Sequence, residues 1–269
     1  MPEFSVDGVG IAYEETGAGF PLIWAHEYAG SIDSWRSQVH YFSRRYRVVT
    51  YAARGYPPSD VPEDVARYSP EQAVDDLYQL MRHLGISSAH LGGLSMGGGT
   101  ALRFGLTHPE MARSLIVASA GSGSDYPGRF REDQATRSEW LLREGVEALR
   151  TYPWGPTRLT LLRKDPSGWQ EFIDQFQQHS PLGLALTSRG VQARRLPLYD
   201  YEPDLRKLAM PVLILLGDED EPCINVGLFL KKTIPQAGLA MFPRSGHAIN
   251  LEESDLFNRS VLDFLTSVQ

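Results

Sequence analysis

The feature that most constrains the fold is an alternation of short apolar runs with helical patterns, broken only once along the chain. The apolar runs are Phe4–Val6, Gly10–Tyr13, Pro21–Ala25, Tyr46–Tyr51, Ala89–Leu94, Ser114–Ala118, Pro211–Leu216 and Ala240–Phe242. The helical patterns cover residues 32–44, 69–84 and 95–108, and a last one carries Leu256, Phe257, Val261, Leu262 and Leu265. Strands that alternate with helices form βαβ units and a mostly parallel sheet. The chain is therefore predicted to be an α/β protein.

The alternation is broken between residues 122 and 206. This stretch has helical patterns at Glu139–Leu149 and Trp169–Phe176, and it has no strand-like run. Its larger aromatic residues include Trp140, Trp154, Trp169, Phe172 and Phe176. We predict one core domain made of residues 1–121 and 207–269, and a helical insertion of residues 122–206. The insertion follows a strand, so it is expected to cover the carboxyl edge of the sheet, where ligands bind in open α/β sheets.

Composition excludes several classes of protein. The chain has 269 residues and a formal charge of −7, which argues against general binding to nucleic acid. Its single cysteine, Cys223, rules out a disulfide framework and any metal site with several cysteines. No clustered histidines or phosphate-binding glycine motif indicate a metal or cofactor, so neither is expected. The apolar run Val212–Leu216 is too short to span a bilayer, and residues 1–4 do not resemble a secretory signal. We expect a cytoplasmic protein without a membrane partner, and its oligomeric state is left open, a homodimer being one candidate.

A G-x-S-x-G motif lies where a predicted strand meets a predicted helix. Its sequence is Gly93-Leu94-Ser95-Met96-Gly97. A sharp turn at this point holds the serine in a strained conformation with its hydroxyl above the sheet, and the neighbouring glycines leave room for the turn. The alternative is an ordinary glycine-rich turn with a serine at the helix N-cap. The strand–turn–helix context favours Ser95 as a nucleophile.

A serine nucleophile needs a histidine base and a carboxylate that orients it. In this architecture the acid and the histidine follow the serine along the chain, each after a late strand. The acidic loop Gly217–Pro222 follows one late strand, and Gly246-His247 follows the next. Among the seven histidines, only His247 has this placement. The sequence thus predicts His247 as the base and an acid within the loop.

Taken together, these motifs resemble those of α/β-hydrolase-fold serine hydrolases that carry a helical cap, such as esterases and enol-lactone hydrolases. The resemblance covers nearly the whole chain and rests on His26-Glu27-Tyr28-Ala29-Gly30, Trp35, Arg54-Gly55, residues 93–97, Gly217–Pro222, Gly246-His247 and Leu251-Glu252. It implies that Asp220 is the acid, with Asp218 as second choice. The expected nucleophile is serine rather than the aspartate of dehalogenases and epoxide hydrolases of this fold.

The resemblance also implies an oxyanion hole made by the backbone N–H groups of Tyr28 and Met96. Glu27 departs from the family pattern, because it occupies a position that is normally glycine. We expect Glu27 to point out of the site or to meet a neighbour such as Arg54. The alternative is a carboxylate that borders the pocket.

The substrate-binding residues are expected to be Tyr28, Trp140 and Trp154. Three arginines, Arg189, Arg194 and Arg195, could meet a substrate carboxylate, although a charged outer face is the favoured use. The chain is predicted to be a cofactor-independent serine hydrolase that cleaves a small carboxylic ester or lactone through an acyl-enzyme. The alternatives are a carbon–carbon bond hydrolase of a vinylogous diketone and, from another class, a ligand receptor built on the same fold. Fold alone does not separate them.

Overall fold

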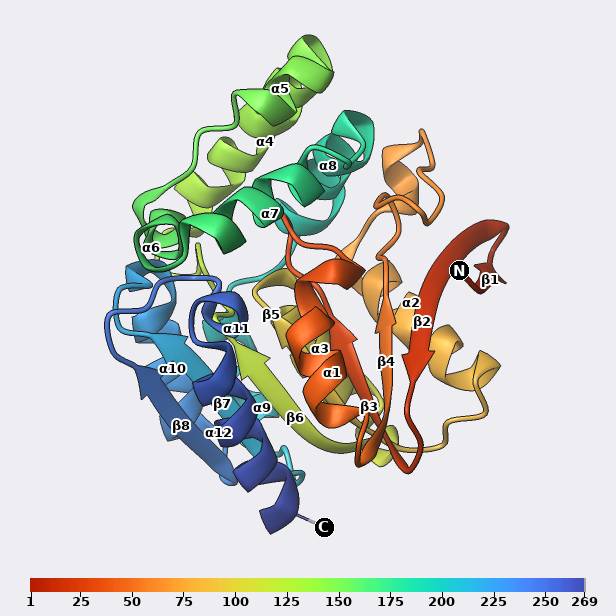
Figure 1. Cartoon of the computed structure of the whole chain (residues 1–269), viewed down its shortest axis with the longest axis vertical. Coiled ribbons are helices and arrows are strands. Elements are labelled where there is room, and N and C mark those ends of the chain that lie inside the picture. The colour runs from red at the N-terminus through yellow and green to blue at the C-terminus, as the bar shows by residue number, and fades with distance from the viewer. Residues whose placement is uncertain (269) are drawn as a thin grey trace.

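Eight strands form one sheet at the centre of the computed structural model, which describes residues 1–268 (Figure 1). The strands are β1 Glu3–Val6, β2 Val9–Thr16, β3 Phe20–Ala25, β4 Tyr46–Tyr51, β5 Ala89–Leu94, β6 Ala112–Ala118, β7 Val212–Gly217 and β8 Ala237–Phe242. Their order is β1-β2-β4-β3-β5-β6-β7-β8. Strand β2 pairs antiparallel with β1 and β4, and all other neighbours are parallel. The predicted mostly parallel α/β sheet is confirmed.

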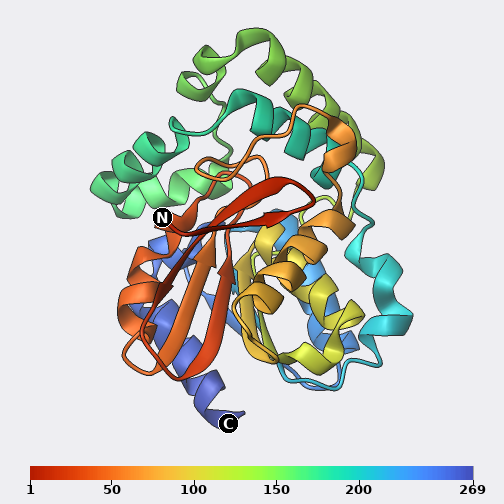
Figure 2. The ribbon, with the colours of Figure 1, turned by 90° about the vertical axis from the view of Figure 1, so that its right-hand side faces the viewer.

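Helices cover both faces of the sheet (Figure 2). Helices α1 (Arg36–Phe42) and α12 (Ser254–Ser267) pack on one face, against a core that includes Trp24. On the other face lie α2 (Pro70–His83), α3 (Met96–Thr107) and α10 (Glu221–Thr233). Every residue of β5 and β7 is buried, as expected of central parallel strands covered on both sides.

Most predicted elements lie within a few residues of the observed ones. The pattern at residues 32–44 becomes a 3₁₀ turn, η1 (Ile32–Trp35), followed by α1. Shorter elements complete the core, namely η2 (Val65–Arg67), η3 (Pro109–Met111), η5 (Leu198–Tyr201), α9 (Glu202–Leu205) and α11 (Ile249–Glu252). None of the helices within residues 1–268 has the length and apolar character that a membrane crossing requires.

A layer of helices lies beyond the carboxyl ends of the parallel strands, at the top of Figure 1. It consists of α4 (Pro127–Glu144), α5 (Val146–Arg150), α6 (Pro156–Lys164), α7 (Pro166–Phe176), α8 (Pro181–Thr187) and the π-helical turn η4 (Ser188–Gln192), and we call it the helical segment. The predicted helix Glu139–Leu149 is wrong as a continuous helix. Gly145, with φ of 58°, ends α4 and a second helix starts after it. The domain boundary at residues 122–206 stays a prediction.

Candidate active site

Ser95 lies in the sharp turn between β5 and α3. Its φ of 54° and ψ of −108° are rarely adopted by residues other than glycine, and such a conformation costs about 1–3 kcal/mol. The turn is very tight, because a Cβ atom on Gly97 would lie 2.0 Å from the carbonyl oxygen of Ala25. A Cβ on Gly93 would lie 2.3 Å from the backbone of Gly97. Both glycines are therefore required by the turn that presents Ser95.

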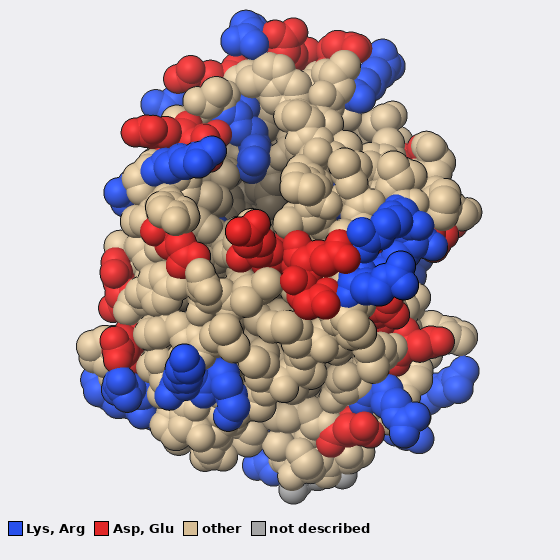
Figure 3. Space-filling view, turned by 90° about the vertical axis from the view of Figure 1, so that its left-hand side faces the viewer, with Lys and Arg blue, Asp and Glu red and all other residues tan. Residues whose placement is uncertain are grey.

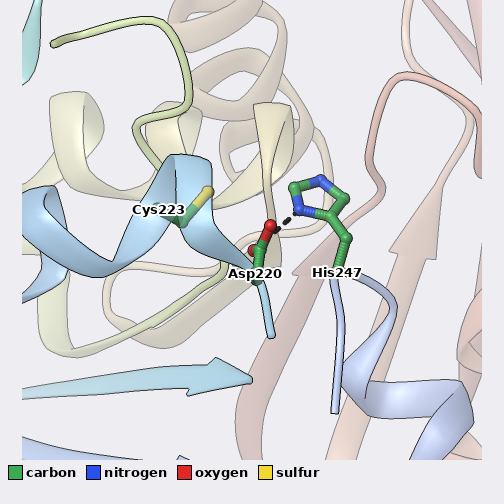
Figure 4. A group of neighbouring side chains, drawn as sticks. All are labelled: Asp220, Cys223 and His247. Atoms are coloured by element: carbon green, nitrogen blue, oxygen red, sulfur yellow. Dashed lines mark hydrogen bonds and ion pairs between the residues drawn. The ribbon is translucent and has the colours of Figure 1, made fainter. Parts of the chain in front are cut away.

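Asp220 and His247 meet at the ends of β7 and β8. The Nδ1 atom of His247 lies 2.8 Å from Oδ2 of Asp220, and the aspartate is fully buried (Figure 4). Burial alone would raise the pKa of Asp220, but the charge and hydrogen bond of the His247 imidazole outweigh it, so the pKa lies below its ordinary value. Asp218 is exposed and accepts a hydrogen bond from the Ser245 N–H instead. Of the two predicted acids, Asp220 is thus the one beside His247.

Cys223 is the third member of the group in Figure 4. Its sulfur and the ligand atoms of Asp220 and His247 lie within 4.8 Å of one another, a spacing that could suit a metal ion. Burial raises the pKa of the Cys223 thiol well above its usual range, and the thiol donates to the Ser119 carbonyl oxygen at 3.3 Å. Metals bind the thiolate rather than the thiol. The donor chemistry therefore fits an aspartate–histidine pair beside a packed thiol better than a metal site.

Ser95, Asp220 and His247 line one cavity of about 230 Å³ under the helical segment. Ser95 makes no hydrogen bond to His247, and the two residues share the cavity wall. Tyr28 and Trp154 also line it, and their role in substrate binding stays a prediction. Trp140 is not among the lining residues, and its ring packs on Tyr152, which lines the cavity itself. The other lining residues are Ala29, Ser122, Phe130, Gln134, Arg137, Tyr152, Pro153, Gly155, Thr157, Arg158, Gln192 and Pro222.

The loop after β3 is fixed by hydrogen bonds from its histidine. The Ala53 N–H donates to Nε2 of His26 at 2.9 Å, so the ring proton lies on Nδ1, which donates to the Glu27 carbonyl oxygen at 2.7 Å. Burial, with a smaller contribution from His179, lowers the pKa of His26 to about 3, which keeps the ring neutral. The N–H groups of Tyr28 and Met96 have no hydrogen-bond partner among residues 1–268. Both are free to donate to a ligand.

Glu27 does not point out of the site, and its partner is not Arg54. Its side chain is 1% exposed and forms a two-pronged ion pair with Arg158 of α6, with Nη1 2.5 Å from Oε1. Arg54 pairs with Asp76 of α2 instead. Glu27 is also absent from the cavity lining, since Arg158 stands on the cavity side of the pair. The expectation for Glu27 is therefore corrected, because its partner lies on a helix that the sequence did not predict.

Helix α6 contacts three of the loops around the cavity, those that carry Glu27, Glu219 and His247. Beside the ion pair to Glu27, its Thr157 carbonyl oxygen accepts from the His247 N–H at 2.8 Å. Arg163 binds both carboxylate oxygens of Glu219, in the acid loop, at 2.9 Å. A side chain on Gly246 would collide with Thr157 at 2.0 Å. One helix of the helical segment thus fixes the positions of all three loops.

The arginines of the cavity are Arg137 and Arg158, which the sequence did not single out. Among the three predicted candidates, Arg189 and Arg194 are exposed. Arg195 contacts the Ser122 carbonyl oxygen and stacks on Phe130 with a distance of 4.5 Å to the ring centroid, outside the cavity lining. None of the three lines the cavity.

The Glu27–Arg158 pair gives a test of stability. Replacing Glu27 with glutamine is expected to lower the free energy of unfolding by about 2 kcal/mol, because it leaves the Arg158 charge, 13% exposed, without a partner. The matched control is Glu15→Gln, which breaks the exposed Glu15–Arg47 pair and should cost under about 1 kcal/mol. Urea unfolding of both variants, and of Glu27→Gln with Arg158→Gln, measures this. Equal losses of unfolding free energy in Glu27→Gln and Glu15→Gln would contradict the conclusion that Glu27 and Arg158 form a buried ion pair.

Comparison with known proteins places these features in a family. A family model described as alpha/beta hydrolase fold matches residues 21–254. A 2-hydroxy-6-oxononadienedioate/2-hydroxy-6-oxononatrienedioate hydrolase of Burkholderia vietnamiensis is 29% identical, over 95% of this chain and 90% of its own. A 3-oxoadipate enol-lactonase of Acinetobacter baylyi is 27% identical, over 89% of this chain and 86% of its own. The names of these two relatives give different substrates, a 2-hydroxy-6-oxo-dienedioate and an enol-lactone.

Similar solved structures include a thermophilic esterase from Thermogutta terrifontis with malate bound. It superposes with a TM-score of 0.84 at 25% identity, over 99% of this chain and 97% of the esterase. The similarity extends over the sheet and the helical segment together. The family model, the named relatives and the sheet topology agree, and the chain belongs to the alpha/beta hydrolase fold family and is a hydrolase.

Proposed function

We propose that this hydrolase cleaves a small carboxylic ester or lactone with Ser95 as nucleophile, His247 as base and Asp220 as the orienting acid. The observation that carries the proposal is the shared cavity, in which a serine on a strained turn and a buried aspartate–histidine pair face the same space. The cavity of about 230 Å³ lies at the small end of ligand sites, which favours a small substrate.

In the proposed reaction the Ser95 oxygen attacks the carbonyl carbon and its proton passes to Nε2 of His247. Nδ1 of His247 faces Asp220, so Nε2 is the nitrogen left for this transfer. The tetrahedral intermediate collapses as His247 protonates the leaving oxygen, which leaves an acyl-enzyme on Ser95. Water then attacks the acyl carbon, its proton goes to His247 and on to the Ser95 oxygen, and the acid is released. With a lactone, the leaving oxygen stays attached to the acyl chain.

The N–H groups of Tyr28 and Met96 are the proposed donors to the oxyanion. Their lack of any other partner supports this role. The hydroxyl of Tyr56 donates to the Tyr28 carbonyl oxygen at 2.9 Å and so fixes the orientation of the loop. Arg158 keeps the Glu27 carboxylate occupied, which limits its repulsion of charge on the substrate oxygen.

The helical segment is the proposed cap over this site. Tyr152 and Trp154 form part of the cavity wall, and Trp154 packs against Phe172 and Phe176 with ring centroids 5.2 Å and 4.8 Å apart. The aromatic residues of the segment therefore divide between its own core and the wall. This arrangement supports a cap that is built as one unit and that shapes the substrate space.

A substrate panel tests the proposed chemistry. We expect multiple turnovers of neutral short-chain esters or small lactones, with kcat/KM reaching about 10⁴ M⁻¹s⁻¹ for the best of them. The product acid is titrated at constant pH. A single turnover with a lasting adduct would instead support the receptor alternative, and no turnover of any ester or lactone would contradict the proposal.

The second candidate is carbon–carbon bond hydrolysis of a vinylogous diketone by the same residues. It is favoured by the 29% identity to the Burkholderia vietnamiensis relative, whose name gives that substrate class. Loss of the visible absorbance of a 2-hydroxy-6-oxo-dienoate reports this reaction. Faster turnover of the dienoate than of every ester and lactone would replace the first candidate with the second.

A further inference from the structure

The charges around the cavity do not balance. The Asp220 carboxylate faces His247, and the guanidinium of Arg158 is paired with Glu27. Arg137 of α4 also lines the cavity, and it has no carboxylate partner among residues 1–268. The Arg137 charge in the wall is therefore not balanced by a carboxylate of the described part of the chain.

Arg137 is held in place without being neutralised. Its Nη1 donates to Oε1 of Gln134, a buried residue one turn earlier on α4, at 3.2 Å. Its guanidinium lies over two aromatic rings, 5.4 Å from the centroid of Tyr28 and 5.8 Å from that of Tyr152. Contacts of this kind fix the orientation of an arginine and leave its charge available.

Gln134, Tyr28 and Tyr152 line the cavity together with Arg137, so this unpaired cation is part of the built wall rather than of the outer surface. An arginine presents N–H donors in a planar fork that matches a carboxylate. Tyr28 also supplies one proposed oxyanion donor, which links the cation to the reacting end of the cavity.

We infer that Arg137 binds a carboxylate on the substrate, and that this hydrolase selects monoesters or lactones that carry such a second, ionised group. This inference rests on the proposed function and names its substrate class. Hydrolysis then yields a dicarboxylate from a monoester, or a hydroxy-dicarboxylate from a lactone. The carboxylate pairs with Arg137, and the ester carbonyl lies toward Ser95.

The surface around the opening carries both signs of charge. Figure 3 shows a hollow between the helical segment and the sheet, with acidic side chains along its lower rim and basic ones reaching its upper wall. Rim charges face solvent and are screened by salt, whereas a charge inside the cavity is screened much less. The interior cation is therefore the one expected to govern selection.

The test compares monomethyl esters of straight-chain dicarboxylic acids, from succinic to suberic, with the corresponding neutral dimethyl esters. At the chain length that fits best, we expect kcat/KM of the monoanion to exceed that of the dimethyl ester at least tenfold, after allowing for two equivalent ester groups. Arg137→Gln should remove this preference, so that the ratio of kcat/KM for the monoanion to kcat/KM for the neutral ester falls at least tenfold. Arg137→Lys keeps the charge and loses the planar fork of N–H donors, so its preference for the monoanion should lie between those of wild type and Arg137→Gln. The matched control is Arg129→Gln, an exposed arginine of the same helix, which should behave as wild type.

Binding gives a second readout that needs no turnover. Calorimetric titration of Ser95→Ala with the dicarboxylate product should detect binding, and Ser95→Ala with Arg137→Gln should bind at least tenfold more weakly. The inference is overturned if wild type hydrolyses neutral and anionic esters at equal rates, or if Arg137→Gln slows the hydrolysis of both equally. In either case, neutral-ester turnover that depends on Ser95 would still support the proposed function. If wild type binds the dicarboxylate but turns over no ester or lactone, the proposed function is overturned instead.

Discussion

Replacing Ser95 with alanine is expected to lower kcat for the best ester by about 10⁴- to 10⁶-fold, because it removes the hydroxyl on which the proposed acyl-enzyme forms. The residual rate would come from the oxyanion donors and from binding alone. The fold should survive, because alanine fits in the space of serine and the Ser95 side chain makes no hydrogen bond to any residue between 1 and 268.

Ser95→Gly is the matched comparison. It should lose the same activity, and it should be more stable than Ser95→Ala by about 1 kcal/mol, because glycine adopts the φ of 54° without strain. Steady-state kinetics and urea unfolding measure the two effects separately. Turnover that persists in both variants would contradict the role of Ser95, and equal stability would contradict the strain at the turn.

Asp220→Asn is expected to lower kcat by roughly 10⁴-fold, because asparagine cannot stabilise the charged imidazole and permits the wrong tautomer. Asp220 is fully buried with its Oδ2 atom 2.8 Å from Nδ1 of His247, so solvent cannot replace it. The expected loss lies in kcat rather than in KM, since the carboxylate acts on the histidine and not on the substrate.

Asp218→Asn is the control from the same loop. Asp218 is exposed and bonds the Ser245 backbone, a contact that asparagine can keep, so kcat should stay within about threefold of wild type. Initial rates on one neutral ester suffice for both variants. A large loss in Asp218→Asn with little change in Asp220→Asn would move the acid to Asp218.

The sheet could be predicted from sequence because its strands are buried, uninterrupted apolar runs. Strands β4 and β5 begin and end at the predicted residues. The glycines of the 93–97 motif placed a sharp turn between β5 and α3, and the geometry of Ser95 agrees with it. These features depend on local sequence, which explains why they could be predicted from it.

The helical segment was predicted as helical but not in detail. Helix α6 was missed because its leucines do not form one apolar face, since Leu161 is buried while Leu159 and Leu162 are about 40% exposed. One feature of the sequence does indicate the start of α6, because Pro156 lies in its first turn, as a proline does in several other helices of this chain. Without α6, the partner of Glu27 could not be named.

The position of Arg137 depends on tertiary packing. It follows from how α4 crosses the cavity and from the two tyrosines that its guanidinium covers, one of them far away in the chain. Sequence position instead drew attention to Arg189, Arg194 and Arg195, which cluster along the chain and do not line the cavity. Contacts between segments that are distant in the sequence thus determine which residues line the cavity besides Ser95, Asp220 and His247.

Covalent labelling tests whether Ser95 is the nucleophile of this site. The protein is treated with a fluorophosphonate, and the modified peptide is identified by tandem mass spectrometry together with the loss of ester turnover. We expect one adduct per chain, on Ser95, formed in step with inactivation and absent from Ser95→Ala. An adduct on another residue, or full inactivation with Ser95 unmodified, would contradict it.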